Sequence, residues 1–130
     1  DLDDDGDTDL IVTDCGTTPQ VLRNDAGARG GWVRVVLAGK ESGRDGYGAE
    51  VRVTASGRAQ RDQARAAYSY LSSNDPRLLF GVGSAGEAVV EVRWPSGAVD
   101  RVERVPARRT VVVTEGQGGV VTEAGPGERP

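Results

Sequence analysis

The segment Trp32-Val33-Arg34-Val35-Val36-Leu37 places Val33, Val35 and Leu37 at every second position. Side chains two residues apart on an extended strand point to the same face, so these three side chains share one face that can be buried. The segment Ala49-Glu50-Val51-Arg52-Val53-Thr54-Ala55 repeats the alternation. Because a helix would need apolar residues three and four positions apart, both segments predict β-strands.

Short strand patterns separated by turn residues continue from this region to Glu115. The further expected strands are Ala59 to Ala67, Tyr68 to Leu71, Leu78 to Phe80, Val89 to Trp94, Val99 to Val105 and Thr110 to Thr114. The polar run Ala59 to Ala67 fits a strand or a helix, and its position between turns favours a strand. About eight short strands at this spacing are typical of an antiparallel β-sandwich or barrel-like domain.

Six of the first ten residues, Asp1-Leu2-Asp3-Asp4-Asp5-Gly6-Asp7-Thr8-Asp9-Leu10, are aspartates. Asp1, Asp3 and Asp5 alternate, Gly6 permits a sharp bend, and Asp9 follows, so four carboxylates can face one centre. Each pair repels by roughly 1 kcal/mol at about 4 Å in bulk water and by roughly 4 kcal/mol near a protein surface. Hard oxygen ligands in a flexible loop favour Ca²⁺ over Mg²⁺, and without a cation we expect the arrangement to open.

The loop matches the first half of an EF-hand, but Val12 stands where that motif needs a glutamate. Residues 1–10 instead resemble the FG-GAP repeat of integrin-like β-propellers, Asp-x-Asp-x-Asp-Gly-x-x-Asp-Leu, at every defined position. The resemblance implies a calcium site with side-chain ligands and one backbone carbonyl. The side-chain ligands would be Asp1, Asp3, Asp5 and Asp9, and the carbonyl that of Asp7. The alternative is an acidic, solvated chain end.

Composition excludes several classes of function. The 130 residues carry a net charge of −4, and no basic stripe with stacking aromatic residues indicates nucleic-acid binding. The chain has no histidine and only Cys15, which excludes Ser-His-Asp and Cys-His catalysis and His- or multi-Cys zinc sites within it. No apolar stretch approaches the roughly 18 residues of a membrane span. The chain has no methionine and begins with aspartate, so we expect a piece of a longer protein.

A stretch of roughly 85 residues resembles the ASPIC/UnbV domain, which is found in the family of cartilage acidic protein and its bacterial relatives. The matching segments occur in the family's order: Leu22 to Asp25, Trp32 to Val35, Gly43 to Ala49, Tyr70 to Asp75, Phe80 to Gly83, and Val92 to Gly97. Gly43 stands where asparagine is usual, and Val82 where leucine is common.

The two resemblances divide the chain into a terminal β-propeller blade fragment at 1–28, an all-β ASPIC/UnbV-like domain at 29–115, and a Gly/Pro-rich tail at 116–130. The tail is expected to be disordered apart from Val120-Val121. The resemblances imply a calcium-binding, non-catalytic module outside the cell or in the cell envelope. Its partners would be a protein or glycan and the rest of an upstream propeller. An enzyme or accessory protein of bacterial biosynthesis, and a lectin-like module, are the alternatives.

Other candidate sites have weaker patterns. The glycines of 81–86 spell G-x-G-x-x-G, but the strand pattern after them indicates a tight turn rather than a nucleotide site. Trp32 and Trp94 are expected to be buried against the opposite sheet, whereas a lectin-like module would expose one of them. A glycosidase would need two carboxylates, and spacing selects no pair among Asp45, Glu50, Asp62, Asp75 and Glu91.

Overall fold

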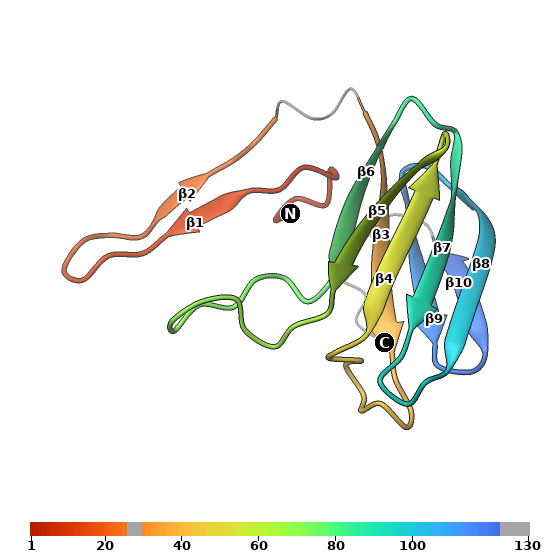
Figure 1. Cartoon of the computed structure of the whole chain (residues 1–130). Coiled ribbons are helices and arrows are strands. Elements are labelled where there is room, and N and C mark those ends of the chain that lie inside the picture. Colours follow the sequence, from red (N-terminus) through yellow and green to blue (C-terminus); the bar gives the residue numbers. More distant parts are fainter. Residues whose placement is uncertain (26–29, 123–130) are drawn as a thin grey trace.

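The computed structural model describes residues 1–25 and 30–122, and every regular element in these ranges is a β-strand (Figure 1). Two four-stranded sheets pack face to face, and a two-stranded hairpin projects from one side of them. The prediction of an all-β fold with a sandwich-like domain is therefore confirmed.

The strands form three sheets. The hairpin consists of β1 (Leu10–Val12) and β2 (Gln20–Leu22), which pair antiparallel. The first sheet contains, in spatial order, β10 (Gly118–Thr122), β9 (Arg109–Thr114), β3 (Gly31–Ala38) and β6 (Leu78–Gly83). The second sheet contains, in spatial order, β5 (Arg58–Gln63), β4 (Glu50–Ala55), β7 (Glu87–Arg93) and β8 (Val99–Pro106).

The core lies between the two four-stranded sheets and consists mainly of valines. Val33 and Val35 of β3 are fully buried, as are Val51 of β4 and Val90 of β7. Full burial of a valine contributes about 1.5–3 kcal/mol. The period-two alternation thus correctly identified the inward faces of β3 and β4.

The outer face of β3 is also buried. The alternation in the sequence had predicted that only one face of this strand is buried. Trp32 and Arg34 point away from the core and are 6% and 2% exposed. The N-terminal aspartate loop covers them, since Gly6 lies against the Trp32 ring and Asp1 pairs with Arg34. The prediction that Trp32 packs against the opposite sheet was wrong, whereas Trp94 does belong to the core between the sheets.

The first sheet is mixed rather than antiparallel. β3 and β9 pair in parallel, with Val35 opposite Val111, because β9 reaches this sheet by crossing over from β8 in the other layer. Thr110 to Thr114 was expected to be the last strand, yet β10 pairs antiparallel with β9. The tail predicted at 116–130 therefore begins with an ordered strand, and residues 123–130 lie outside the described part of the chain.

The connections position the remaining features. The expected domain boundary between residues 28 and 29 falls within 26–29, outside the described residues. The polar run 59–67 is a strand as far as Gln63, where β5 ends. The segment 68–71 has only an isolated bridge between Ser69 and Ser72 instead of the expected strand. The described ranges contain no helix with the length and apolar character of a membrane span.

Candidate metal centre

The aspartate loop packs on the outer face of β3 because of one glycine. Gly6 has a φ of 97°, and a Cβ atom at this position would lie 2.0 Å from the Trp32 ring. Any other residue would both strain the backbone and collide with the indole. Gly6 therefore allows the bend that the sequence predicted, and it also allows the loop to contact the sheet.

The loop brings together some, but not all, of the predicted ligands. One carboxylate oxygen each from Asp1, Asp3 and Asp9 lie within 4.8 Å of one another. Asp5 instead joins Asp3 and Asp25 in a second group of the same size. Asp3 belongs to both groups, so the acidic cluster is elongated rather than a single ring of four carboxylates. Asp25, at the end of the described N-terminal range, was not among the predicted ligands.

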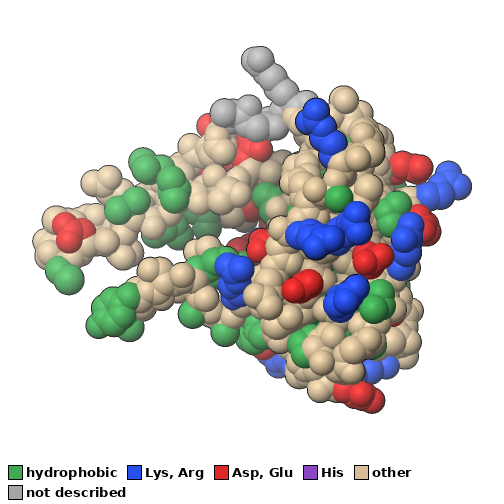
Figure 2. Space-filling view, in the orientation of Figure 1, with side chains coloured by type: hydrophobic (Ala, Val, Ile, Leu, Met, Phe, Trp, Pro, Cys, Tyr) green, Lys and Arg blue, Asp and Glu red, His purple; other side chains and the backbone are tan. Residues whose placement is uncertain are grey.

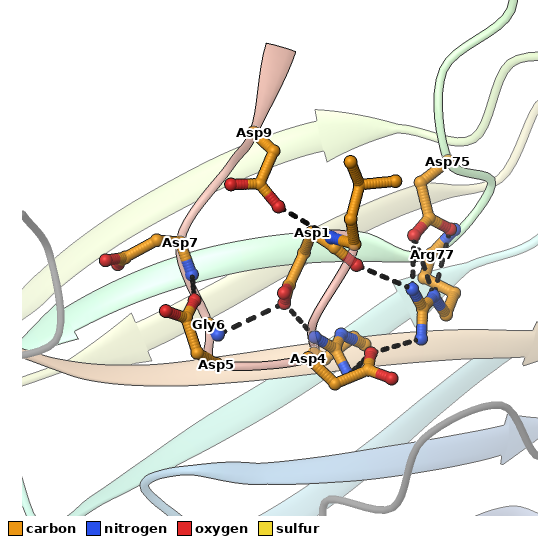
Figure 3. A network of polar contacts seen from close by, with 10 residues as sticks. Asp1, Asp4, Asp5, Gly6, Asp7, Asp9, Asp75 and Arg77 are labelled. Carbon is orange, nitrogen blue, oxygen red and sulfur yellow. Dashed lines mark hydrogen bonds and ion pairs between the residues drawn. The ribbon is translucent and has the colours of Figure 1, made fainter. Parts of the chain in front are cut away.

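Backbone N–H groups hold Asp5 and Asp9 in place (Figure 3), whereas Asp3 pairs with Arg23 at 3.5 Å. Asp9 accepts hydrogen bonds from the N–H groups of Leu2, at 2.7 Å, and Asn24, at 2.8 Å. The bond from Asn24 is the main cause that lowers the pKa of Asp9, followed by the bond from Leu2. Asp5 accepts a bond from the N–H of Asp7 at 2.9 Å. Asp7 is 7% exposed, and its carboxylate belongs to neither group. This is compatible with its expected part in the site, since the ligand predicted from Asp7 is its backbone carbonyl.

Two arginines of the sandwich clamp the loop. Arg34 pairs with Asp1 and, at 2.8 Å, with Asp4. Arg77, from the loop before β6, donates to Asp4 at 2.8 Å and to Asp75 at 2.6 Å (Figure 3). Burial lowers the pKa of Arg34, with Arg77 as the next cause. Burial raises the pKa of Asp75, but the hydrogen bonds from Arg77 outweigh this effect and lower it.

These arginines reduce the repulsion among the carboxylates that the sequence predicted. Repulsion among the carboxylates was expected to open the loop unless a cation entered it. The guanidinium groups of Arg34 and Arg77 supply part of that positive charge from within the protein. Arg34 gave one sequence signal, since it is the single charged residue of β3. The role of Arg77 had no local signal, because Asp4 lies 73 residues away.

One oxygen in the loop has no partner among the described residues. The Asp1 side chain is 4% exposed, and its Oδ2 contacts Arg34 and the N–H of Gly6. Its Oδ1 is buried without a hydrogen bond. An unpaired buried carboxylate oxygen costs about 1–3 kcal/mol or more. A hard divalent cation between Asp1, Asp3 and Asp9 would satisfy it, and Ca²⁺ prefers such oxygens, so the residues present fit that ion.

The opposite end of the sandwich brings together two of the segments that carried the second resemblance, 43–49 and 92–97. Glu115 accepts hydrogen bonds from the Lys40 N–H, from both the N–H and the hydroxyl of Ser42, and from the Ser96 hydroxyl. Asp100 accepts the Trp94 indole N–H at 2.7 Å and the N–H of Gly116 at 2.8 Å. Both carboxylates are buried, and they join loops that are distant in sequence. Neither carboxylate was predicted as a structural centre, because the fold brings its donors together from separate loops and turns.

The other candidate sites differ in how far the structure supports them. Of the five carboxylates considered for a glycosidase, Glu50 and Glu91 line one small depression, together with arginines of β4, β5 and β7. Both tryptophans are buried, so neither can stack on a sugar, whereas the side chains of Tyr47, Tyr68 and Tyr70 are exposed. Residues 81–83 end β6, and residues 84–86 form the tight turn to β7. An open depression of about 440 Å³ is lined by Glu87 and Glu103, and Glu87 pairs with Arg104 at 3.5 Å. Cys15 is exposed in a turn.

Comparison with known proteins gives one finding. A family model described as ASPIC and UnbV matches residues 39–120, which is more than half of the chain. The match begins after β3 and ends within β10, so it includes both carboxylates at the opposite end of the sandwich. The comparisons with curated proteins and with solved structures found no match. The FG-GAP resemblance of residues 1–10 lies outside the matched range and stays a prediction.

Proposed function

This chain belongs to the ASPIC and UnbV family, and we propose that it is a non-catalytic interaction module stabilised by a structural calcium ion. The observation that carries the proposal is the buried, unpartnered Oδ1 of Asp1 beside the carboxylates of Asp3 and Asp9. Acidic groups often gather at surfaces, but a carboxylate oxygen that is buried and unpaired calls for a cation. Backbone carbonyls and water would complete the six to eight oxygens typical of Ca²⁺.

The proposed interaction surface is the β1–β2 hairpin. Its apolar side chains are largely exposed and lie on the projection in Figure 2. They are Leu10, Ile11, Val12, Val21 and Leu22, which are 47–61% exposed. A lone two-stranded hairpin is marginally stable in water, and a contiguous apolar patch marks an interaction site. The FG-GAP resemblance favours the other strands of a propeller blade as the partner, beside an unidentified protein or glycan.

The proposed location is outside the cell or in the cell envelope. Extracellular calcium modules bind with dissociation constants of about 0.1–1 mM, so the ion would be bound there and largely absent in a cytosol. At a free calcium concentration about tenfold above the dissociation constant, binding stabilises the fold by about 1.4 kcal/mol. The loop would then hold the hairpin against the sandwich.

The test is titration calorimetry of the whole chain with calcium chloride, with thermal melts in calcium and in EDTA. We expect binding in the range of about 0.1–1 mM and a higher melting temperature with calcium. Asp3→Asn removes the carboxylate shared by both groups and is expected to weaken binding at least about tenfold. Asp14→Asn changes the net charge equally at an exposed position outside both groups and is the matched control. Identical melts and no binding heat would refute the proposal.

The enzyme and lectin-like alternatives have less support. Trp32 and Trp94 are buried, so a sugar could not stack on either. The depression beside Glu87 and Glu103 is open to solvent, whereas catalytic sites are concave and enclose most of their ligand. Binding of a glycan with Tyr47, which is 42% exposed, would revive the lectin-like alternative.

A further inference from the structure

Arg34 occupies an unusual position for an arginine. It lies in the middle of β3, it is 2% exposed, and it faces away from the apolar core. A buried guanidinium is retained only where its charge and its donors are satisfied. Arg34 therefore depends on the aspartate loop as much as the loop depends on it.

The contacts of Arg34 divide the Asp1 carboxylate into two different oxygens. Nη2 of Arg34 donates to Oδ2 of Asp1, and Nη1 pairs with Oδ1 of Asp4 at 2.8 Å. Gly6 N–H also donates to Oδ2 of Asp1, at 3.2 Å. No described residue donates a hydrogen bond to Oδ1 of Asp1, which is buried. The planar fork of a guanidinium fixes the orientation of the carboxylate as well as its charge.

We propose that Arg34 is the positioning residue of the calcium site: its fork fixes Asp1 so that Oδ2 faces the protein and Oδ1 is left for the ion. The inference rests on the proposed function, because it assigns a role at the same site. It also implies that Asp1 contributes a single oxygen, and that the ion and the guanidinium bind the same carboxylate at the same time.

A charge-only role for Arg34 predicts the opposite result from a positioning role. If Arg34 were only a neighbouring positive charge, it would repel the ion, and its removal would tighten calcium binding. A lysine would then behave like the arginine, since the charge is retained. If Arg34 acts by orientation, lysine loses the fork that bridges Asp1 and Asp4 and weakens binding despite its charge.

The structure also offers an optical reporter for the site. The Arg34 guanidinium lies 5.0 Å from the centroid of the Trp32 ring, and Gly6 of the loop contacts the same ring. Trp94, the second tryptophan, lies in the core between the sheets. A change in Trp32 emission on addition of calcium is therefore expected, and it should disappear in Trp32→Phe.

The experiment measures calcium dissociation constants by calorimetry for the unmodified chain, Arg34→Lys, Arg34→Met, Arg77→Lys and Arg52→Lys. We expect both Arg34 variants to weaken binding about tenfold or more, as loss of a residue that orients a metal ligand does. Arg77→Lys loses contacts to Asp4, to Asp75 and, at 3.3 Å, to the backbone carbonyl of Asp1. It loses none to the Asp1 carboxylate, so it is expected to weaken binding less. Arg52→Lys is the control that should leave calcium binding unchanged, because Arg52 is exposed on β4 of the other sheet.

The outcomes separate the inference from the function on which it rests. No binding by the unmodified chain would refute the calcium site and the role of Arg34 with it. Normal binding by the unmodified chain together with unchanged Arg34→Lys, tighter Arg34→Met, or an equal loss in Arg77→Lys would refute the positioning role alone.

A measurement on the unmodified chain decides the question if the Arg34 variants do not fold. Hydrogen exchange of the Arg34 side-chain N–H groups, followed by NMR, is expected to stay slow in the presence of calcium. Fast exchange on calcium addition would mean that the ion displaces the guanidinium from Asp1, and would overturn the inference.

Discussion

Asp100→Ala tests whether a buried carboxylate holds the far end of the sandwich together. Asp100 is 7% exposed and accepts hydrogen bonds from the Trp94 indole, from Gly116 N–H and, at 2.9 Å, from Gly118 N–H. The variant removes the acceptor and leaves three donors without a partner. Two of these donors flank the turn that leads into β10, so the change also affects the edge of the first sheet.

The expected loss follows from the burial of each donor. The Trp94 side chain lies in the core, so its unpaired N–H costs about 1–3 kcal/mol. Water can reach the turn and partly replace the bonds to Gly116 and Gly118, whose loss costs about 0.5–1.5 kcal/mol each. The sum is a destabilisation of about 2–6 kcal/mol, a large fraction of the 5–15 kcal/mol typical of a domain. Asp100→Asn retains one acceptor oxygen and is expected to lose about half as much.

The assay is urea denaturation at neutral pH followed by circular dichroism. Asp45→Ala is the control, because Asp45 is an exposed carboxylate at the same end whose ion pair with Arg44 is also exposed. The control is expected to change the free energy of unfolding by no more than about 0.5 kcal/mol. The reasoning fails if Asp100→Ala and Asp45→Ala destabilise the fold equally.

Two further predictions concern the aspartate loop and Glu115. Gly6→Ala is expected to push the loop off Trp32 and to shift the Trp32 emission to longer wavelength. Gly16→Ala is the control, because Gly16 has a similar φ of 92° and open space around it, and its emission should stay unchanged. Equal spectra for the two variants would contradict this prediction. Burial raises the pKa of Glu115, but hydrogen bonds led by those from the Ser42 and Ser96 hydroxyls lower it to about 2, from a usual value of 4.5. A lowered pKa in the folded state stabilises the fold above pH 4.5, and this stabilisation is lost as the pH falls towards 2. The unfolding free energy of Glu115→Gln, measured between pH 2 and pH 6, is therefore expected to depend less on pH than that of the unmodified chain, and parallel curves would be the contrary result.

Much of the fold was predictable from local patterns. The alternation in β3 and β4 identified their inward side chains, since a strand has only two faces and Val33 and Val51 mark one of them. The strands expected at 89–94 and 99–105 are β7 and β8, which pair antiparallel because a tight turn joins them. The elongated acidic cluster was predicted only in part, since spacing along the loop does not determine which oxygens meet.

The predictions that failed share one cause: each feature depends on contacts between residues that are distant in the sequence. β9 pairs in parallel with β3 because a crossover from the other sheet places it there, and no local pattern reports that crossing. β10 was assigned to the disordered tail apart from Val120-Val121, because its glycines favour disorder in isolation, while the free edge of β9 orders the whole strand. Trp32 fits an inward or an outward position equally well until the loop that covers it is known.

The order of residues alone was enough for the all-strand architecture, the inward faces of its main strands and the acidic loop with its glycine bend, because each depends on neighbours within a few positions. The partners of that loop depended on the folded chain. Arg34 meets Asp1 across 33 residues, Arg77 meets Asp4 across 73, and Glu115 meets Ser42 across 73. Charge compensation between buried groups follows from distance in space, and only the packed sheets bring these side chains within reach of one another.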